Sequence, residues 1–222
     1  MKSMRKPMRI ISLNVGQPRL VPYAGGEALT GIFKEPVEGP LFLRHLNLDG
    51  DRQADLTVHG GRNKALYAYA SEHYSFWRQE LPGMDLPWGM FGENLTTEGL
   101  LEGDAHIGDR FRIGEAVVAV TQPRLPCFKL GIRFGRDDIV KRFFASRRSG
   151  IYFSVVEEGR VNVGDAIEEV SRAPEGISVA DVNRAYANAA NDLPLLRRIV
   201  QSKILPPGLH QDLADELAAL GG

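Results

Sequence analysis

Residues 109–122 read DRFRIGEAVVAVTQ, and this stretch is the clearest sign of the fold. Phe111 and Ile113 alternate with arginines, and a longer apolar run follows them. Such a pattern is typical of strands packed on at least one face. The segment VGDAIEEV at 163–170 echoes IGDRFRI at 107–113, because both place a Gly-Asp turn before a short apolar strand. Two such units favour a meandering β architecture, as a closed or strongly curved barrel, over alternating βαβ units.

Further short runs of β-branched or apolar residues predict strands at residues 8–15, 42–48, 151–156 and 166–170. Helical patterns in this part of the chain are short. Ser71 is placed to cap a helix over the residues that follow it, and Asp137 is placed to start another. We therefore expect a mainly β (α+β) unit with short helices.

The composition changes after residues 173–176, Ala-Pro-Glu-Gly. From there, alanine and leucine recur at helical spacing, with Ser178 and Asp181 as a capping-box variant and a second helix beginning at Asp192. Short amphipathic helices of this size bury too little surface to fold alone, so they should dock on the β domain or on a partner. The sequence thus predicts a β-barrel domain at 1–172 and a three-helix extension at 173–222.

The charge balance excludes several classes of partner. Lys plus Arg number 27 and Asp plus Glu number 28, so there is no broad basic field for nucleic acid. The sequence has no apolar run of about 18 residues that would form a membrane span, and its basic start predicts a short tail instead of a signal peptide. A single cysteine permits no internal disulfide. We expect a folded cytoplasmic protein that binds neither nucleic acid nor membrane.

That cysteine, Cys127, lies in VTQPRLPCFKL at residues 120–130. A lone cysteine is commonly buried and packs as a small hydrophobe. In this segment, however, two prolines stiffen the backbone, and Arg124 and Lys129 place positive charge near the sulfur. Positive charge favours the thiolate, which is the form that binds a soft metal. From the residues alone, a packed thiol and a metal-binding thiol are both open.

The segment VHGGRNK combines glycine with positive charge. It consists of Val58, His59, Gly60, Gly61, Arg62, Asn63 and Lys64. Backbone N–H groups and cations exposed together are able to cradle an anion. The alternative is a glycine turn with solvated basic residues, and the segment has neither a Walker motif nor GxGxxG spacing.

A third segment, FGENLTT at residues 91–97, contains Glu93 and Asn94. A carboxylate and an amide together suit bidentate recognition of a ligand edge, but the same residues also cap turns. Both interpretations are open from the residues alone.

These stretches, in their order and spacing, resemble the MOSC domain, the module named for the C-terminal region of molybdenum cofactor sulfurases. The resemblance covers about residues 8–170 and rests on GDRQADLTVHGGRNKALYAY, EHYSFW, FGENLTTEGLLEGDAHIGDRFRIG, VTQPRLPCFKL and SGIYFSVVEEGRVNVGD. The helical tail resembles the three-helix extension of stand-alone bacterial MOSC proteins of the YiiM type. The implied fold is a mostly β, barrel-like domain.

The resemblance also implies a ligand, the molybdenum cofactor (Mo-molybdopterin), which is a pterin dithiolene carrying a phosphate. Cys127 matches the family's cysteine ligand to molybdenum and becomes the candidate catalytic residue. An anionic dithiolene and phosphate call for cations and backbone donors. The candidate binding residues are His59, Gly60, Gly61, Arg62, Lys64 and Arg124 for these anions, and Glu93, Asn94, Thr121 and Gln122 for the pterin edge.

The implied activity is reduction of N-hydroxylated compounds, such as 6-hydroxylaminopurine, to amines. The chain has no evident second redox centre, so we expect an external electron-transfer protein or reductase as partner. The alternative function is a non-catalytic module that binds the cofactor or carries sulfur. The oligomeric state is open, with a homodimer as one option.

Overall fold

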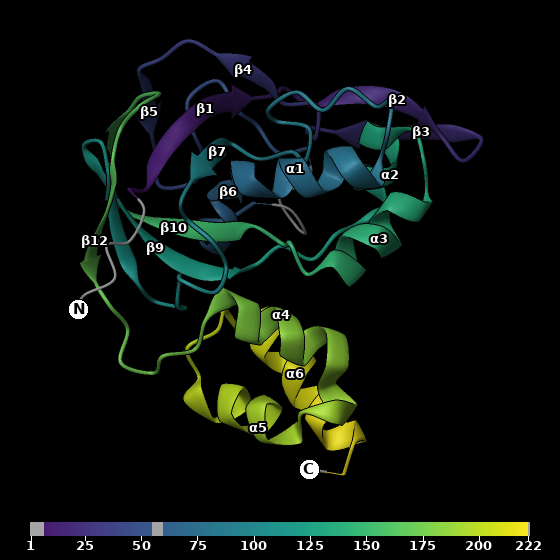
Figure 1. The fold of residues 1–222 in the computed structure, drawn as a ribbon, viewed down its shortest axis with the longest axis vertical. Helices are drawn as coiled ribbons and strands as arrows, with labels where there is room; N and C mark the ends of the chain where they lie inside the picture. Colours follow the sequence, from purple (N-terminus) through teal and green to yellow (C-terminus); the bar gives the residue numbers. More distant parts are fainter. Residues whose placement is uncertain (1–6, 55–59, 222) are drawn as a thin grey trace.

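The structure, a computed structural model, describes residues 7–54 and 60–221 (Figure 1). Its largest element is an eight-stranded mixed sheet with the order β12-β8-β9-β10-β6-β7-β1-β4. Strands β6 and β7 pair in parallel, whereas the other neighbours are antiparallel. The bounds are β1 Arg9–Val15, β4 Glu35–Val37, β6 Leu66–Ala70, β7 Leu95–Glu98, β8 Arg110–Ile113, β9 Ala116–Pro123, β10 Ile151–Glu157 and β12 Ile167–Ser171.

Strands β8 and β9 form the predicted hairpin of residues 109–122. They pair antiparallel from Arg110 opposite Ala119 to Ile113 opposite Ala116. Phe111 is buried between exposed arginines, as the alternation predicted. Strand β9 is buried along nearly all of its length because β8 and β10 flank it and helix α4 (Val179–Asn188) packs against it. The hairpin therefore forms the centre of one half of the sheet.

The sheet is strongly curved, but it does not close into a barrel. The backbone of β1 returns toward the segment before β12, where Ile10 N–H donates to Asp165 O at 3.0 Å and Ile167 N–H to Met8 O at 2.9 Å. Only an isolated bridge between Arg9 and Ala166 results, so the two ends are not joined by a continuous ladder. The mainly β fold class with short helices is confirmed, whereas full closure is wrong because the contact between β1 and β12 does not extend beyond this bridge.

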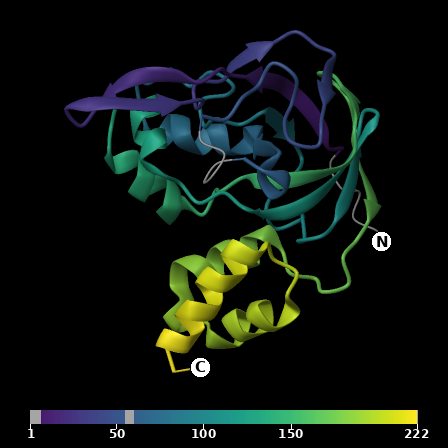
Figure 2. The same cartoon turned by 180° about the vertical axis from the view of Figure 1, so that it is seen from behind.

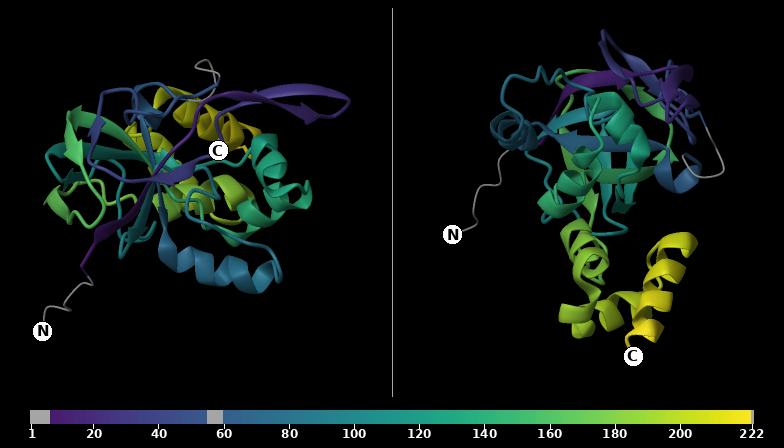
Figure 3. Two further views of the ribbon diagram at one scale, coloured as in Figure 1. Left: turned by 90° about the horizontal axis from the view of Figure 1, so that it is seen from above. Right: turned by 90° about the vertical axis from the view of Figure 1, so that its right-hand side faces the viewer.

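Two small ribbons complete the strands: β2 (Arg19–Tyr23) with β3 (Gly26–Thr30), and β5 (Leu41–Leu43) with β11 (Gly159–Val161). The first ribbon projects from the body (Figures 1, 2 and 3). The strand predicted at 42–48 is shorter than expected. Arg44 N–H donates to Asn47 O at 2.8 Å, which turns the chain after β5.

Three short helices, α1 (Ser71–Glu80), α2 (Phe128–Phe134) and α3 (Asp138–Ser146), lie together beside the sheet, and η1 (Arg62–Lys64) precedes β6 (Figure 1). Their contacts are aromatic. Trp77 donates through Nε1 to the Tyr69 hydroxyl at 2.7 Å and stacks on Phe143. Asp137 is the N-cap of α3 as predicted, but α1 is capped by Ala70 and Ser71 is its first residue.

The C-terminal helices α4 (Val179–Asn188), α5 (Leu193–Ser202) and α6 (Pro207–Ala219), with η2 (Ala189–Asn191), pack against the lower side of the sheet in Figures 1 and 2. The predicted capping box is present, since Asp181 N–H donates to Ser178 Oγ at 3.0 Å and Ser178 N–H donates to Asp181 at 3.1 Å. Val182 of α4 and Val118 of β9 share one apolar core. Docking is thus observed, and the division into two domains at residue 172 stays a prediction.

None of the helices in the described ranges is long and apolar enough to cross a membrane.

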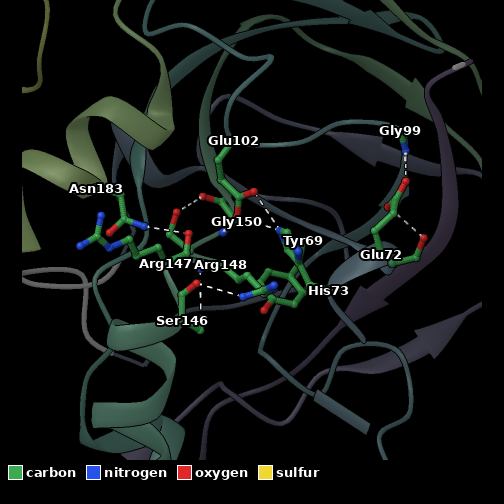
Figure 4. Close-up of polar contacts among 12 residues, drawn as sticks. Tyr69, Glu72, His73, Gly99, Glu102, Ser146, Arg147, Arg148, Gly150 and Asn183 are labelled. Carbon is green, nitrogen blue, oxygen red and sulfur yellow. Dashed lines mark hydrogen bonds and ion pairs between the residues drawn. The ribbon is translucent and has the colours of Figure 1, made fainter. Parts of the chain in front are cut away.

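The buried residue Glu102 joins the two helical groups to the sheet through its carboxylate and its backbone carbonyl (Figure 4). His73 of α1 donates through Nε2 to Glu102 at 2.8 Å, and Gly150 N–H donates to the same carboxylate at 2.7 Å. The carbonyl of Glu102 accepts from Ala180 N–H of α4 at 3.0 Å. Burial alone would raise the pKa of Glu102, but His73 and the Gly150 N–H outweigh it and hold that pKa below its ordinary value.

The variant Glu102→Gln should lower the free energy of unfolding at neutral pH by about 2–3 kcal/mol. A carboxyl group whose pKa is lowered by folding stabilises the folded protein at pH values above its pKa in the unfolded state. This stabilisation disappears as the pH falls through its pKa in the folded state. The stability difference between the variant and wild type should therefore shrink as the pH falls below 4.5, the ordinary pKa of a glutamate side chain. Urea denaturation at a series of pH values measures it.

The matched control is Glu169→Gln, which breaks a surface ion pair with Arg172 at 2.6 Å. It should change stability by no more than about 0.5 kcal/mol. Equal losses in the two variants, or a loss independent of pH, would contradict the role given to Glu102.

Candidate functional site

A pocket opens where the segment between β3 and β4 meets the start of α2. Cys127 and Tyr152 lie on its wall together with side chains from loops distant in the sequence. Five of the described residues that line it are cationic and none is acidic; the cations are Lys34, Arg52, Lys64, Arg124 and Lys129. Because the whole chain has a net charge of −1, this concentration of positive charge is local. The pocket is therefore suited to an anionic ligand.

Cys127 is held at the point where the chain leaves β9 and enters α2. It is the N-cap residue of α2, with extended backbone angles of φ −127° and ψ 174°. Its carbonyl accepts from Leu130 N–H at 3.0 Å, while its side chain makes no capping hydrogen bond. The residue is half-buried on the pocket wall. This placement keeps the thiol near the pocket and out of the main apolar core.

Arg124 is a buried cation three residues before the thiol, with 7% of its surface exposed. It donates to the carbonyl of Phe91, and its guanidinium lies 5.0 Å from the centre of the Tyr67 ring. Burial would lower the pKa of Arg124, but Tyr67, Tyr152 and Cys127 outweigh it and hold the pKa above its ordinary value. The guanidinium therefore stays charged beside the pocket.

A second polar group, centred on Asp51, supports two residues of the pocket wall, Lys34 and Asn94. Its carboxylate accepts from Lys34 Nζ at 2.5 Å, from Asn94 Nδ2 at 2.8 Å and from Gly16 N–H at 2.9 Å. Asn94 also accepts from Tyr67 N–H at 3.2 Å through its side-chain oxygen. Burial lowers the pKa of Lys34, and Asp51 opposes that shift only in part.

Lys34 and Asp51 were not among the residues predicted from the sequence. Asp51 stood inside the GDRQ segment that carried the family resemblance, whereas Lys34 lies in no motif. No spacing rule connects the two, because only the packing of the strand ends brings them together.

Of the predicted site residues, the structure brings five to the pocket wall: Gly60, Lys64, Asn94, Arg124 and Cys127. His59 lies outside the described residues. The remaining five, Gly61, Arg62, Glu93, Thr121 and Gln122, are absent from the described lining, and their role in binding stays a prediction. Thr121, for example, donates its hydroxyl to Asn63 O at 2.6 Å, which anchors the segment containing η1 to β9.

Glu93 is fully buried, and its carboxylate is occupied by its own chain. It accepts from Gly89 N–H at 2.9 Å, Phe91 N–H at 3.1 Å and Thr96 Oγ at 2.9 Å, and from the hydroxyl of Tyr74. Burial raises the pKa of Glu93, although these donors oppose the shift. The carboxylate thus organises the loop before β7 and offers no open edge to a ligand.

The variant Glu93→Gln should lower the free energy of unfolding by about 1–3 kcal/mol, because an amide has one acceptor oxygen for these four donors. Chemical denaturation measures the loss. Glu98→Gln, which alters a surface pair with Arg9 at 2.8 Å, is the control and should lose no more than about 0.5 kcal/mol. Unchanged stability together with loss of bound pterin would instead support the role predicted from the sequence.

The donor chemistry of the pocket limits how a metal is held. Within residues 7–54 and 60–221, no group of three or more His, Cys, Asp and Glu side chains is arranged to hold a metal ion. One thiol among cations and an amide is, however, a fitting set for a metal whose other ligands come from an anionic organic group. The molybdenum cofactor, with its dithiolene and phosphate, fits that description.

The curved mixed sheet and its thiol-containing, cation-lined pocket define a β domain with a helical tail and a pocket suited to an anionic ligand. The chain belongs to the MOSC domain family, whose model matches residues 55–168. It is 44% identical to YflK of Bacillus subtilis over 196 residues, which are 88% of each chain. It is 41% identical to YiiM of Escherichia coli over 148 residues, 66% of each.

Two further comparisons extend this result. A protein of Gibberella moniliformis named "Reductase" is 35% identical over 195 residues, 86% of this chain but 34% of that protein. The crystal structure of YiiM from Geobacillus stearothermophilus superimposes with a TM-score of 0.79 at 31% identity, covering 95% of this chain and 100% of that one. The YiiM-like fold, including the helical tail, is therefore shown.

Proposed function

We propose that the protein binds the molybdenum cofactor in the Cys127 pocket and reduces N-hydroxylated compounds, such as 6-hydroxylaminopurine, to amines. The observation that carries the proposal is the convergence of the sole cysteine and five cationic side chains on one pocket. Membership of the MOSC family supports the cofactor, and the relative named "Reductase" supports the reaction class.

In this proposal each part of the wall has a chemical task. Cys127 is the protein ligand to molybdenum through its thiolate. Arg124 and Lys64 neutralise the dithiolene and phosphate, and the backbone of Gly60 adds a donor. Asn94, held by Asp51 and by Tyr67 N–H, forms part of the wall beside the pterin. The rings of Tyr67 and Tyr152, 4.9 Å apart, form an aromatic wall behind Arg124.

The overall reaction is R–NHOH + 2 e⁻ + 2 H⁺ → R–NH₂ + H₂O. When bound, the cofactor supplies the two-electron redox chemistry, and the chain supplies binding, field and access. The cationic wall attracts an electron-rich ligand and disfavours cationic competitors. Burial of Arg124 and Lys34 limits water around them, which strengthens their electrostatic effect in the pocket.

The variant Cys127→Ala tests the metal ligand. The protein is expressed in a host that makes the cofactor, molybdenum and pterin are quantified, and reduction of 6-hydroxylaminopurine is followed with an artificial electron donor. Loss of the thiolate should reduce molybdenum retention and reduction by at least about 10- to 100-fold.

Ser171→Ala, on the exposed edge strand β12, is the control and should retain both properties. Equal molybdenum content in Cys127→Ala and wild type would refute Cys127 as ligand. A wild-type protein that holds cofactor but does not reduce the substrate would instead be a carrier of the cofactor or its sulfur.

The electrons come, in this proposal, from an external protein, because the sequence has one cysteine and no dinucleotide-binding fingerprint. Purified cofactor-loaded protein should reduce the substrate with an artificial donor, but with NADH alone its rate should be less than about one-tenth of that value. Steady-state assays with each donor measure this, and a full rate with NADH alone would sink the proposal of an external partner.

A further inference from the structure

Lys34 is a buried lysine on the wall of the pocket that also contains Cys127. It lies just before β4, and only 9% of its side chain is exposed. A lysine in this setting loses most of its hydration, which is costly unless a partner compensates for it. The partner is Asp51, 2.5 Å away and with no exposed side-chain surface.

Asp51 is in turn held from two other directions. Asn94 Nδ2 donates to the same carboxylate oxygen as Lys34, at 2.8 Å, and Gly16 N–H donates to the other oxygen at 2.9 Å. These bonds leave the carboxylate little freedom to rotate. The ammonium group is therefore kept in one orientation, at a wall that a ligand in the pocket would contact.

Resting on the proposed function, we propose that Lys34 is the acid that donates a proton to the hydroxyl oxygen of the bound R–NHOH substrate. Asp51 and Asn94 are positioning residues for it. As the N–O bond breaks, the oxygen leaves as water and the nitrogen remains in the amine. Two electrons come from the external electron-transfer protein, one proton comes from Lys34 Nζ, and the second comes from solvent. Lys34 is then neutral and regains its proton from solvent.

The surroundings of Lys34 suit an acid better than an anchor. A lysine with its ordinary pKa of 10.5 gives up a proton reluctantly at neutral pH, whereas burial lowers the pKa of Lys34. Asp51 and, from farther away, Glu93 oppose this shift, and Arg124 adds to it. The other titratable or charged groups on the described wall are Arg52, Lys64, Tyr67, Cys127, Lys129 and Tyr152.

The decisive variant is Lys34→Arg in the cofactor-loaded protein. Arginine keeps the positive charge and a donor for Asp51, but it does not release its proton in this pH range. We expect the turnover number to fall about 100-fold or more with unchanged molybdenum and pterin content. In wild type, turnover should decline as pH rises through the pKa of Lys34, since the protonated form is the acid, and this limb should be missing in the variant. Lys141→Arg, on the exposed side of α3, is the matched control.

Two results would overturn the role of Lys34: turnover within about 3-fold of wild type in Lys34→Arg, or loss of cofactor in step with activity. The first shows that charge alone suffices, and the second shows a binding role. If wild-type protein itself fails to reduce the substrate, the proposed function falls and the proton donor falls with it.

A second measurement needs neither turnover nor a folded variant. In wild-type protein without cofactor, competitive acetylation across a pH series, read by mass spectrometry, gives the pKa of each lysine. Lys34 should titrate below the ordinary lysine pKa of 10.5, and a pKa at or above that value would overturn the proposal. If the pKa of Lys34 is lowered but wild-type protein does not reduce the substrate, the proposed function is wrong while the lowered pKa of Lys34 still holds.

Discussion

The pocket depends on the hydrogen bonds that converge on the buried carboxylate of Asp51. Gly16 follows β1, Lys34 precedes β4 and Asn94 precedes β7, and these three strands are neighbours in the sheet. One carboxylate therefore ties together the ends of three adjacent strands. Burying a charge without partners costs several kcal/mol, so the strand ends are held where they satisfy it. The wall of the pocket is a consequence of that arrangement.

Two other buried carboxylates apply the same principle elsewhere. Glu93 gathers the N–H groups of the loop before β7, and Glu102 joins α1 to the start of β10 and, through its carbonyl, to α4. Loops beside a curved sheet leave many backbone groups without ladder partners, and each buried one needs a hydrogen bond. Acidic side chains supply several acceptors at one point. This explains why Glu93 organises the loop before β7, whereas the binding role that its motif suggested stays a prediction.

Local patterns predicted the elements whose residues interact with near neighbours in the sequence. The alternation of Phe111 and Ile113 identified β8, and Ser178 with Asp181 identified the start of α4, because both depend on contacts within a few residues. The strand expected at 42–48 ends at Leu43, because the chain turns between Arg44 and Asn47 instead of continuing as an extended strand. Of the expected closed or strongly curved barrel, only full closure failed, because the long-range contact between the two ends of the sheet is limited to the bridge between Arg9 and Ala166.

For the site, the sequence by itself identified one thiol, flanked by Arg124 and Lys129, as a candidate to bind a soft metal, with a packed thiol as the alternative. It also identified the glycine and lysine of the loop at residues 60–64 as candidates to bind an anion. Both predictions were possible because each rests on a contiguous segment of the chain. Only the tertiary structure decided that Lys34, paired with Asp51, lines the pocket and that Glu93 does not. The reason is physical: the partners of a buried charge are chosen by which strand ends meet in space, and sequence separation carries no record of that meeting.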